Sequence, residues 1–386
     1  ETVDIYAKAC GVNGERGMVV DLARTNPEGF LEDKRPELIN STDAVIYETH
    51  IRDFTIHKTA NVNHPGKFLG LAQKNTRSPE GLTTGLDHLI ELGITHVHLL
   101  PVFDFATIDE NKLDKPQYNW GYDPLNYNCI EGSYSTNPID GETRIKEFKT
   151  LVQALHKSNI RVIMDVVYNH TYLTKDSYFN MTFPNYFYRQ VNGEFANGSG
   201  CGNEVASERL MVRKFIIDSV TYFAKEYHID GFRFDLMGLI DLETMSLIRQ
   251  ELDKIDPTIM IYGEGWTAGD SPLPVSKRAI KENMSKIQRI AAFNDDFRDG
   301  IKGQVSYAKQ PGFVNGGVGF EETIKFGIVG ATYHPQIDYE KVIYAKKPWA
   351  SQPNQCINYV SCHDNLCLYD KIVETTEGLD MTTRIK

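Results

Sequence analysis

The hydrophobic pattern of the chain changes near residue 44 and then stays regular to about residue 363. In this part, short apolar runs alternate with segments whose apolar residues recur every three or four positions, which predicts strands separated by helices. Alternating strands and helices favour a parallel sheet with crossover helices. We predict seven strands, at residues 44–54, 95–102, 161–170, 231–238, 259–266, 290–297 and 356–363.

The apolar runs are nearly continuous in several of these strands, as in V-I-M-D-V-V at 162–167. A continuous run is typical of a strand that is buried on both faces. Between the strands, two sets of apolar residues each form one helical stripe and therefore predict helices that cover the sheet. The sets are Leu82, Leu86, Leu89 and Ile90, and Val212, Phe215, Ile216, Val220 and Phe223.

Polar residues gather where the predicted strands end, and the long segments 103–142 and 171–207 follow two of these ends. Long loops at the carboxyl ends of parallel strands are typical of a barrel with its site there. The alternative, a doubly wound nucleotide-binding sheet, needs a glycine-rich turn after a strand, and no such turn follows any predicted strand. We therefore predict an α/β fold, a (β/α)8 TIM barrel.

The first forty residues follow another pattern. Two short strands are predicted at 2–9 and 17–22, and a proline-containing linker follows. We predict that residues 1–40 form the end of a small β-sandwich domain and that residues 41–386 form the barrel. Seven strands are one too few for a closed barrel, and the polar segment after Asp364 is too short to supply the missing unit. The eighth unit is expected to be missing from this chain, and a separate C-terminal fragment of the same protein is one candidate for its source.

Composition narrows the class of partner. The chain has 386 residues, of which 41% are hydrophobic and 24% are charged, and its formal net charge is −11. Such an acidic chain repels phosphate backbones and anionic lipids, so we expect no nucleic acid partner. No apolar run reaches the roughly 18 residues of a membrane span. Six scattered cysteines without a C-x-x-C pair favour free thiols and hence the cytoplasm, while secretion or a cell-surface location stays open.

Four strand-end segments carry carboxylates that a barrel would bring together: D-V-V-Y-N-H at 165–170, G-F-R-F-D-L-M-G at 231–238, Y-G-E-G-W at 262–266 and Y-V-S-C-H-D-N at 359–365. Hydrolysis of a glycosidic bond with retention needs two carboxyl groups about 5–5.5 Å apart, one ionised and one protonated. We predict that Asp235 is the nucleophile, held ionised by Arg233 two residues earlier on the same strand face. Glu264 is then the acid/base, with a pKa raised by the apolar side chain of Trp266. Each carboxylate taken alone would more simply be a helix cap or a surface ion pair.

Together, these segments resemble the four signature regions of glycoside hydrolase family 13, the α-amylase family. The segment Y-N-W-G-Y-D-P at 118–124 resembles the signature of the type I pullulanases, the debranching members of that family. The resemblance extends from about residue 44 to residue 365 and departs at Cys362, where a larger polar residue is commoner. It implies a barrel enzyme that hydrolyses α-1,6-glucosidic branch linkages in pullulan, starch or glycogen fragments. It also implies that the domain before the barrel is a glucan-binding-like module.

The resemblance implies further site residues. Asp364 would be the third catalytic carboxylate, which binds sugar hydroxyls and stabilises the transition state. His170 and His363 would bind hydroxyls of the same sugar, and Tyr122 would lie under it. The other expected substrate contacts are Trp120, Asp123, Arg233 and Trp266, of which the tryptophans would stack on sugar rings.

No organic cofactor is expected. His96 and His98 lie on one face of the second strand, but no third ligand accompanies them, so we predict no metal centre there. Calcium in the acidic, asparagine-rich loops after strands two and three stays open, because many family members hold calcium in this way. Two alternative functions also remain: a related family enzyme, such as an isoamylase or an α-1,4 glucan hydrolase, and an inactive glucan-binding barrel. The segment at 118–124 argues against the first, and the complete set of carboxylates and histidines argues against the second.

Overall fold

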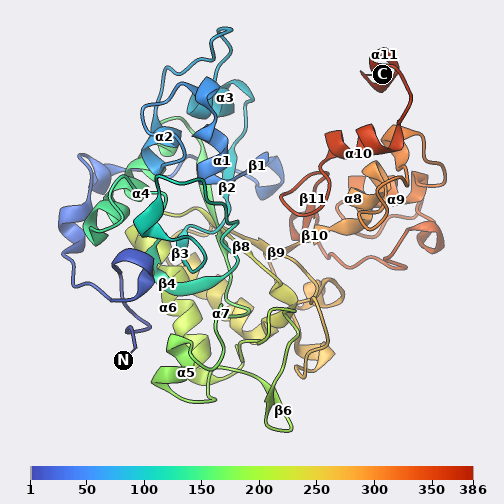
Figure 1. The fold of residues 1–386 in the computed structure, drawn as a ribbon. Helices are drawn as coiled ribbons and strands as arrows, with labels where there is room; N and C mark the ends of the chain where they lie inside the picture. The colour runs from blue at the N-terminus through green and yellow to red at the C-terminus, as the bar shows by residue number, and fades with distance from the viewer. Residues whose placement is uncertain (1, 386) are drawn as a thin grey trace.

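The structure, a computed structural model, describes residues 2–385 and is built on one parallel sheet of seven strands (Figure 1). The strand order is β1-β2-β5-β8-β9-β10-β11, so each strand lies beside the sheet strand that precedes it in the chain. The bounds are β1 Ile46–Thr49, β2 His96–Leu99, β5 Arg161–Val166, β8 Gly231–Phe234, β9 Met260–Gly263, β10 Ala291–Asn294 and β11 Cys356–Asn358. Each lies inside one of the seven predicted segments, so the predicted sheet strands are confirmed.

The sheet curls into a half-barrel rather than closing. Within residues 2–385, β1 pairs only with β2 and β11 pairs only with β10. A groove of about 410 Å³ opens between these two edges, and its lining includes Ile46 and Glu48 from β1 and Cys356 and Ile357 from β11. Strand β5, which is paired on both sides, is buried along its whole length, as its apolar run predicted, whereas no residue of β11 is fully buried.

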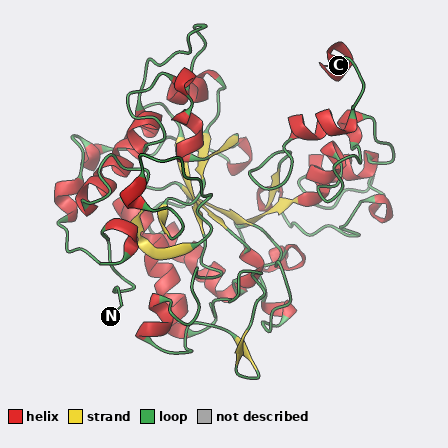
Figure 2. Ribbon diagram, in the orientation of Figure 1, coloured by secondary structure: helices red, strands yellow, loops and turns green. Residues whose placement is uncertain are grey.

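Helices pack around the sheet and give it a hydrophobic core (Figure 2). Their bounds are α1 Ile51–Ile56, α2 Phe68–Ala72, α3 Gly85–Glu91, α4 Gly141–His156, α5 Tyr178–Thr182, α6 Leu210–Glu226, α7 Leu242–Asp253, α8 Asp295–Lys302, α9 Glu321–Ile328, α10 Leu368–Thr375 and α11 Met381–Ile385. The predicted stripe of α6 is buried at every position. The stripe assigned near α3 holds only in part, because Leu82 precedes the helix and Ile90 is exposed.

The two long loops carry structure of their own. Residues 103–142 contain the antiparallel pair β3 Phe103–Phe105 and β4 Pro124–Ile130. Residues 171–207 contain α5 and the short hairpin β6 Gln190–Val191 with β7 Glu194–Phe195. Both loops start at the carboxyl ends of sheet strands, where the site was expected.

The two strands predicted before the linker are wrong. Residues 2–22 form one isolated bridge, between Cys10 and Gly17, and otherwise turns and short 3-10 segments. The segment instead attaches to the barrel through side chains: Asn128 and Cys129 of β4 donate hydrogen bonds to the carbonyls of Ile5 and Ala7, at 3.3 and 3.2 Å. Because these backbone groups find partners outside a sheet, the local strand pattern is overridden. Residues 1 and 386, the outer limits of the two predicted domains, lie outside the described residues.

The last part of the chain forms a lobe of helices beside the end of the sheet. Helices α8, α9 and α10 lie near β11, and α11 lies beyond α10 at the C-terminal end, far from the N-terminus in Figure 1. Between residues 2 and 385, no helix is both long and apolar enough to cross a bilayer.

Candidate functional site

The two predicted catalytic carboxylates lie side by side at the carboxyl edge of the sheet. Asp235 directly follows β8 and Glu264 directly follows β9, and Phe234 pairs with Gly263 in the register of these parallel strands. The backbone N–H groups continue the ladder by one step, from Asp235 to Val166 and from Glu264 to Phe234. The rigid sheet therefore fixes both Cα positions, and no loop lies between strand and carboxylate.

Arg233 joins these carboxylates. Its buried guanidinium donates from Nη1 to Asp235 Oδ1 at 2.9 Å and to Asp165 Oδ1 at 3.0 Å, and Nη2 lies 3.0 Å from Glu264 Oε1. The predicted Arg233–Asp235 contact is thus present, and the same cation also reaches Glu264. One guanidinium that contacts three carboxylates sets their mutual orientation.

The environment of Glu264 favours its protonated form. Burial raises the pKa of Glu264 to about 7, and this effect outweighs the opposing charge of Arg233. Leu236 N–H donates to Glu264 Oε2 at 2.9 Å and fixes the second oxygen. A Cβ on Gly263, which precedes Glu264, would lie 2.5 Å from Phe234 O, and one on Gly265, which follows it, would lie 2.9 Å from Lys281. Their role here is therefore close packing of the protein itself.

His170 is held by the protein on both ring nitrogens. Nδ1 lies 2.7 Å from Asn169 Oδ1, and Nε2 lies 2.9 Å from the carbonyl oxygen of Tyr122. Asn169 in turn donates from Nδ2 to Asp235 Oδ2 at 2.8 Å. A sugar hydroxyl that binds His170 would have to share or displace one of these bonds.

The segment 118–124 folds over the same edge of the sheet. Tyr122 donates its hydroxyl to Asp165 Oδ2 at 2.8 Å, and its ring stacks on His363 with centroids 4.9 Å apart. Trp120 is 38% exposed and meets His363 edge to face. Asp123 lies within the loop, where it accepts bonds from the backbone N–H of Thr107 and the side chain of Asn119. Its contacts in this structure therefore shape the loop.

The remaining predicted residues come from the ends of β9 and β11. Trp266 is partly buried against the apolar interior of the half-barrel. His363 reaches Tyr122 and Glu48. Asp364 is exposed, and within the described residues its side chain makes no hydrogen bond or ion pair. The structure thus brings Asp235, Glu264 and Arg233 together, while Asp364 is not joined to them.

Three residues of the site were not named as site residues from the sequence, although Asp165 is the carboxylate of the predicted segment 165–170. Asp165, Glu48 and His98 form a polar layer under the carboxylates, with His98 Nε2 3.1 Å from Asp165 Oδ2 and His98 Nδ1 3.9 Å from Glu48 Oε2. Asp165 and His98 sit in strands that are buried along their whole length, and a polar side chain in such a strand was a signal that could have marked them. His96, by contrast, is buried with its Nε2 unpartnered, and burial lowers its pKa to about 4.

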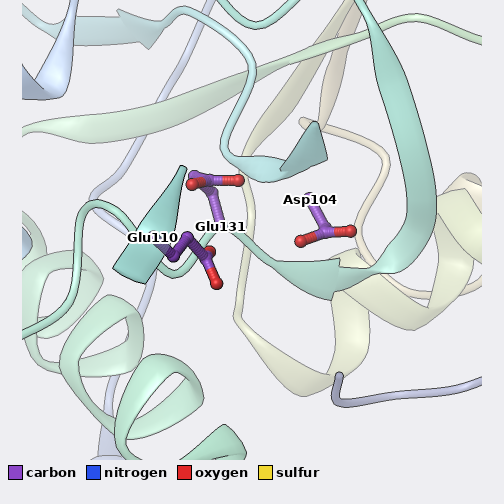
Figure 3. A group of neighbouring side chains, drawn as sticks. All are labelled: Asp104, Glu110 and Glu131. Carbon is purple, nitrogen blue, oxygen red and sulfur yellow. The ribbon is translucent and has the colours of Figure 1, made fainter. Parts of the chain in front are cut away.

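A second group of carboxylates lies in the loop after β2 (Figure 3). Asp104, Glu110 and Glu131 are buried, and one oxygen from each lies within 4.8 Å of the others. Arg144 Nη2 lies 2.6 Å from Glu110 Oε2, and Nη1 lies 3.6 Å from Asp104 Oδ1. Among residues 2–385, Asp104 Oδ1 and Glu110 Oε1 find no hydrogen-bond partner.

When all three carboxylates are ionised, the single positive charge of Arg144 balances only one of them. Two negative charges then remain to be neutralised. Protons are one way to neutralise them: burial raises the pKa of Asp104 to about 7 and that of Glu131 well above its usual range. A divalent cation is the other, and carboxylate oxygens are donors that calcium prefers. The donor chemistry therefore fits calcium.

Known proteins resemble the chain over almost all of its length. The α-amylase catalytic domain matches residues 64–189. A pullulanase of Bacillus subtilis is 43% identical over 96% of this chain and 50% of its own length. The crystal structure of a pullulanase from Paenibacillus barengoltzii, in complex with maltohexaose and α-cyclodextrin, superposes with a TM-score of 0.94 at 49% identity, over 100% of this chain and 58% of that one. Isoamylase 1 of rice is 38% identical over 51% of this chain and 24% of its own.

These pullulanase matches cover almost all of this chain but only part of each relative. The chain spans about half the length of the pullulanases that it matches. The resemblance to the α-amylase family and to type I pullulanases is confirmed, and the isoamylase match covers a smaller part of the chain.

Proposed function

Because this chain belongs to the α-amylase family, we propose that it is the catalytic part of a debranching enzyme that hydrolyses α-1,6-glucosidic linkages with retention. One observation carries the proposal: two carboxyl groups on neighbouring strands share Arg233, and burial leaves Glu264 with a pKa of about 7. Retaining hydrolysis needs one ionised and one protonated carboxyl group at such a place. The proposed substrates are pullulan and branched fragments of starch or glycogen, and the relatives bound to maltooligosaccharides support an α-glucan.

Hydrolysis would proceed in two steps. An oxygen of Asp235 forms a bond to the anomeric carbon while the glycosidic C–O bond breaks, and Glu264 gives its proton to the leaving oxygen. Glu264 then takes a proton from water, whose oxygen bonds to the anomeric carbon and releases Asp235. Arg233 and Asn169 each donate a hydrogen bond to one oxygen of Asp235 and so hold its carboxyl group in place for the first step.

The remaining residues would bind the sugar. Tyr122 would lie under the ring at the cleaved bond, with His170 and His363 near its hydroxyls. Trp120 and Trp266 would stack on neighbouring sugars, and Asp123 would hold the loop that carries the first of them. Asp364 would stabilise the transition state, which requires its exposed side chain to turn toward Asp235.

The choice of bond is best tested by the products of pullulan. An α-1,6 hydrolase releases maltotriose. Panose or isopanose as the main product would mean that α-1,4 bonds are cut, and this outcome would support the α-1,4 hydrolase alternative. No reducing ends from pullulan or branched glucans, with binding retained, would support an inactive glucan-binding barrel.

We also propose calcium at Asp104, Glu110 and Glu131, as a structural ion and not as a participant in hydrolysis; no organic cofactor is proposed. The unpartnered oxygens of Asp104 and Glu110 support this site. The melting temperature of the wild-type protein should rise when calcium is added back after chelation. The Asp104→Asn variant should lose this rise. A melting temperature independent of calcium would leave protons as the balancing charge.

The complete barrel, we propose, has an eighth unit between β11 and β1, supplied by the protein of which this chain is part or by a separate C-terminal fragment. The two half-paired edge strands and the groove between them support this unit. A glucan-binding β-sandwich before the barrel is likewise a proposal. Intact-mass analysis of the purified protein tests the eighth unit, because full activity and stability in a single species of 43.8 kDa would contradict it.

A further inference from the structure

Glu48 contacts the ring and the backbone of His363 at once, although the two residues lie on the opposite edges of the half-barrel. Glu48 is on β1, and His363 follows β11. The backbone N–H of His363 donates to Glu48 Oε1, and the ring Nδ1 lies 3.3 Å from Glu48 Oε2. One carboxylate therefore fixes both the position of the residue and the rotation of its ring.

Hydrogen-bond accounting assigns a proton to Nδ1 of His363. Besides Glu48, this atom meets the hydroxyl oxygen of Tyr122 at 3.4 Å. The Tyr122 hydroxyl already donates to Asp165, so its oxygen acts as an acceptor toward the ring. Since both neighbours of Nδ1 accept, Nδ1 carries hydrogen. Within residues 2–385, Nε2 has no hydrogen-bond partner and remains for a ligand.

The charges around His363 favour its cationic form. Glu48 on β1 and Asp165 on β5 attract a cation, while Arg233 on β8 and His50 after β1 oppose it. Burial alone would lower the pKa of His363, but the hydrogen bond and charge of Glu48 outweigh it and raise the pKa above 6.5. Burial opposes ionisation of Glu48 too, yet His363 and His98 hold its pKa below the usual range.

We propose that Glu48 is a positioning residue that holds His363 as a cation with Nε2–H directed at a sugar hydroxyl. The inference rests on the proposed function, because it makes the bound sugar the ligand of Nε2. A protonated Nε2 can only donate, so it would select an acceptor oxygen and strengthen the bond as charge develops. Glu48 itself would touch no substrate.

The test measures maltotriose binding against pH in the Glu264→Gln background, in which the acid/base no longer titrates. Affinity should fall as pH rises through the pKa of His363, because the neutral ring loses its Nε2 proton. Adding Glu48→Gln should move that fall to lower pH by about one unit or more, since an opposite charge at this range shifts a pKa by roughly one to three. The exposed Glu243→Gln, which removes the same charge from α7, should leave the midpoint in place.

Two further measurements separate positioning from mere packing. In a double-mutant cycle, Glu48→Gln should cost no additional affinity once His363→Asn is present. Titration of the His363 ring by NMR, with His363→Asn for assignment, should give a pKa above 6.5 in wild type and a lower one in Glu48→Gln. The NMR arm needs no sugar, so it stands even if maltotriose does not bind. An unmoved binding midpoint, additive losses, or a wild-type pKa at or below 6.5 would each overturn the proposal.

Discussion

Leu236 shows how one residue couples the two proposed catalytic carboxyl groups, Asp235 and Glu264. Its backbone is left-handed, with φ 40° and ψ 51°, a conformation that costs a residue other than glycine of order 1 kcal/mol or more. The turn comes directly after Asp235 and points the Leu236 N–H at Glu264. Strain in the backbone thus accompanies a fixed distance between the two groups.

At Asp235, we predict that Asp235→Asn reduces kcat on pullulan about a thousand-fold or more, which is several kcal/mol of barrier. The amide has the same shape but cannot form the covalent intermediate. Circular dichroism and thermal unfolding should show a folded protein, because no cavity is created. A variant with a tenth of wild-type activity would contradict the assignment of the nucleophile.

Glu264→Gln should separate substrates by their leaving groups. An activated aryl glucoside needs no proton on departure, so its hydrolysis should fall much less than that of pullulan. In wild type, kcat/KM for pullulan should decline as pH rises through about 7, where Glu264 loses its proton, and the variant should lose this decline. Steady-state rates between pH 5 and 9 check both points. Equal losses on the two substrates would argue for another acid/base.

At the scale of elements, a buried ionic cluster attaches the N-terminal segment to the barrel. His156 at the end of α4 lies 2.7 Å from Asp33 Oδ2 and 2.8 Å from Asp230 Oδ2, and His228 also reaches Asp33. Burial opposes the charge on His156, but the two carboxylates raise its pKa from 6.5 to about 9.

This cluster predicts a pH-dependent stability. A pKa raised on folding stabilises the folded state below the unfolded value of 6.5, by about 3 kcal/mol for this shift, and the gain is lost as pH rises to about 9. The melting temperature should therefore fall as the pH rises from 6.5 to about 9. His156→Gln should lower stability near pH 6 and flatten this part of the profile. An equally steep profile in the variant would show that other groups cause it.

The elements also show what the sequence could and could not predict. Strands such as β5 were predictable because burial on both faces leaves a continuous apolar run. Glu48 and His363 could not be paired from the sequence, because their contact joins two edges separated by most of the chain. The two N-terminal strands were predicted wrongly for a similar reason. Side chains on β4 bind the backbone carbonyls that a neighbouring strand would have bound in the predicted sheet.

At the scale of the whole molecule, the half-barrel should be most stable at its centre. Strands β5 and β8 are buried and paired on both sides, whereas β1 and β11 are paired on one side and border the groove. Amide hydrogen exchange on this chain should be slowest in β5 and β8 and fastest among the sheet strands in β11. Uniform protection across the sheet would mean that it unfolds only as a unit.

The order of the strands bears on how the protein can form during synthesis. Each sheet strand after β1 pairs with the one made just before it, so every later strand finds a partner that is already present. The ribosome adds about 5–20 residues per second, which is slow enough for each new strand to dock before the next emerges. At every moment, the unpaired edge on the growing side would be the strand made last. A chaperone that follows this moving edge would need to shield one short strand at a time.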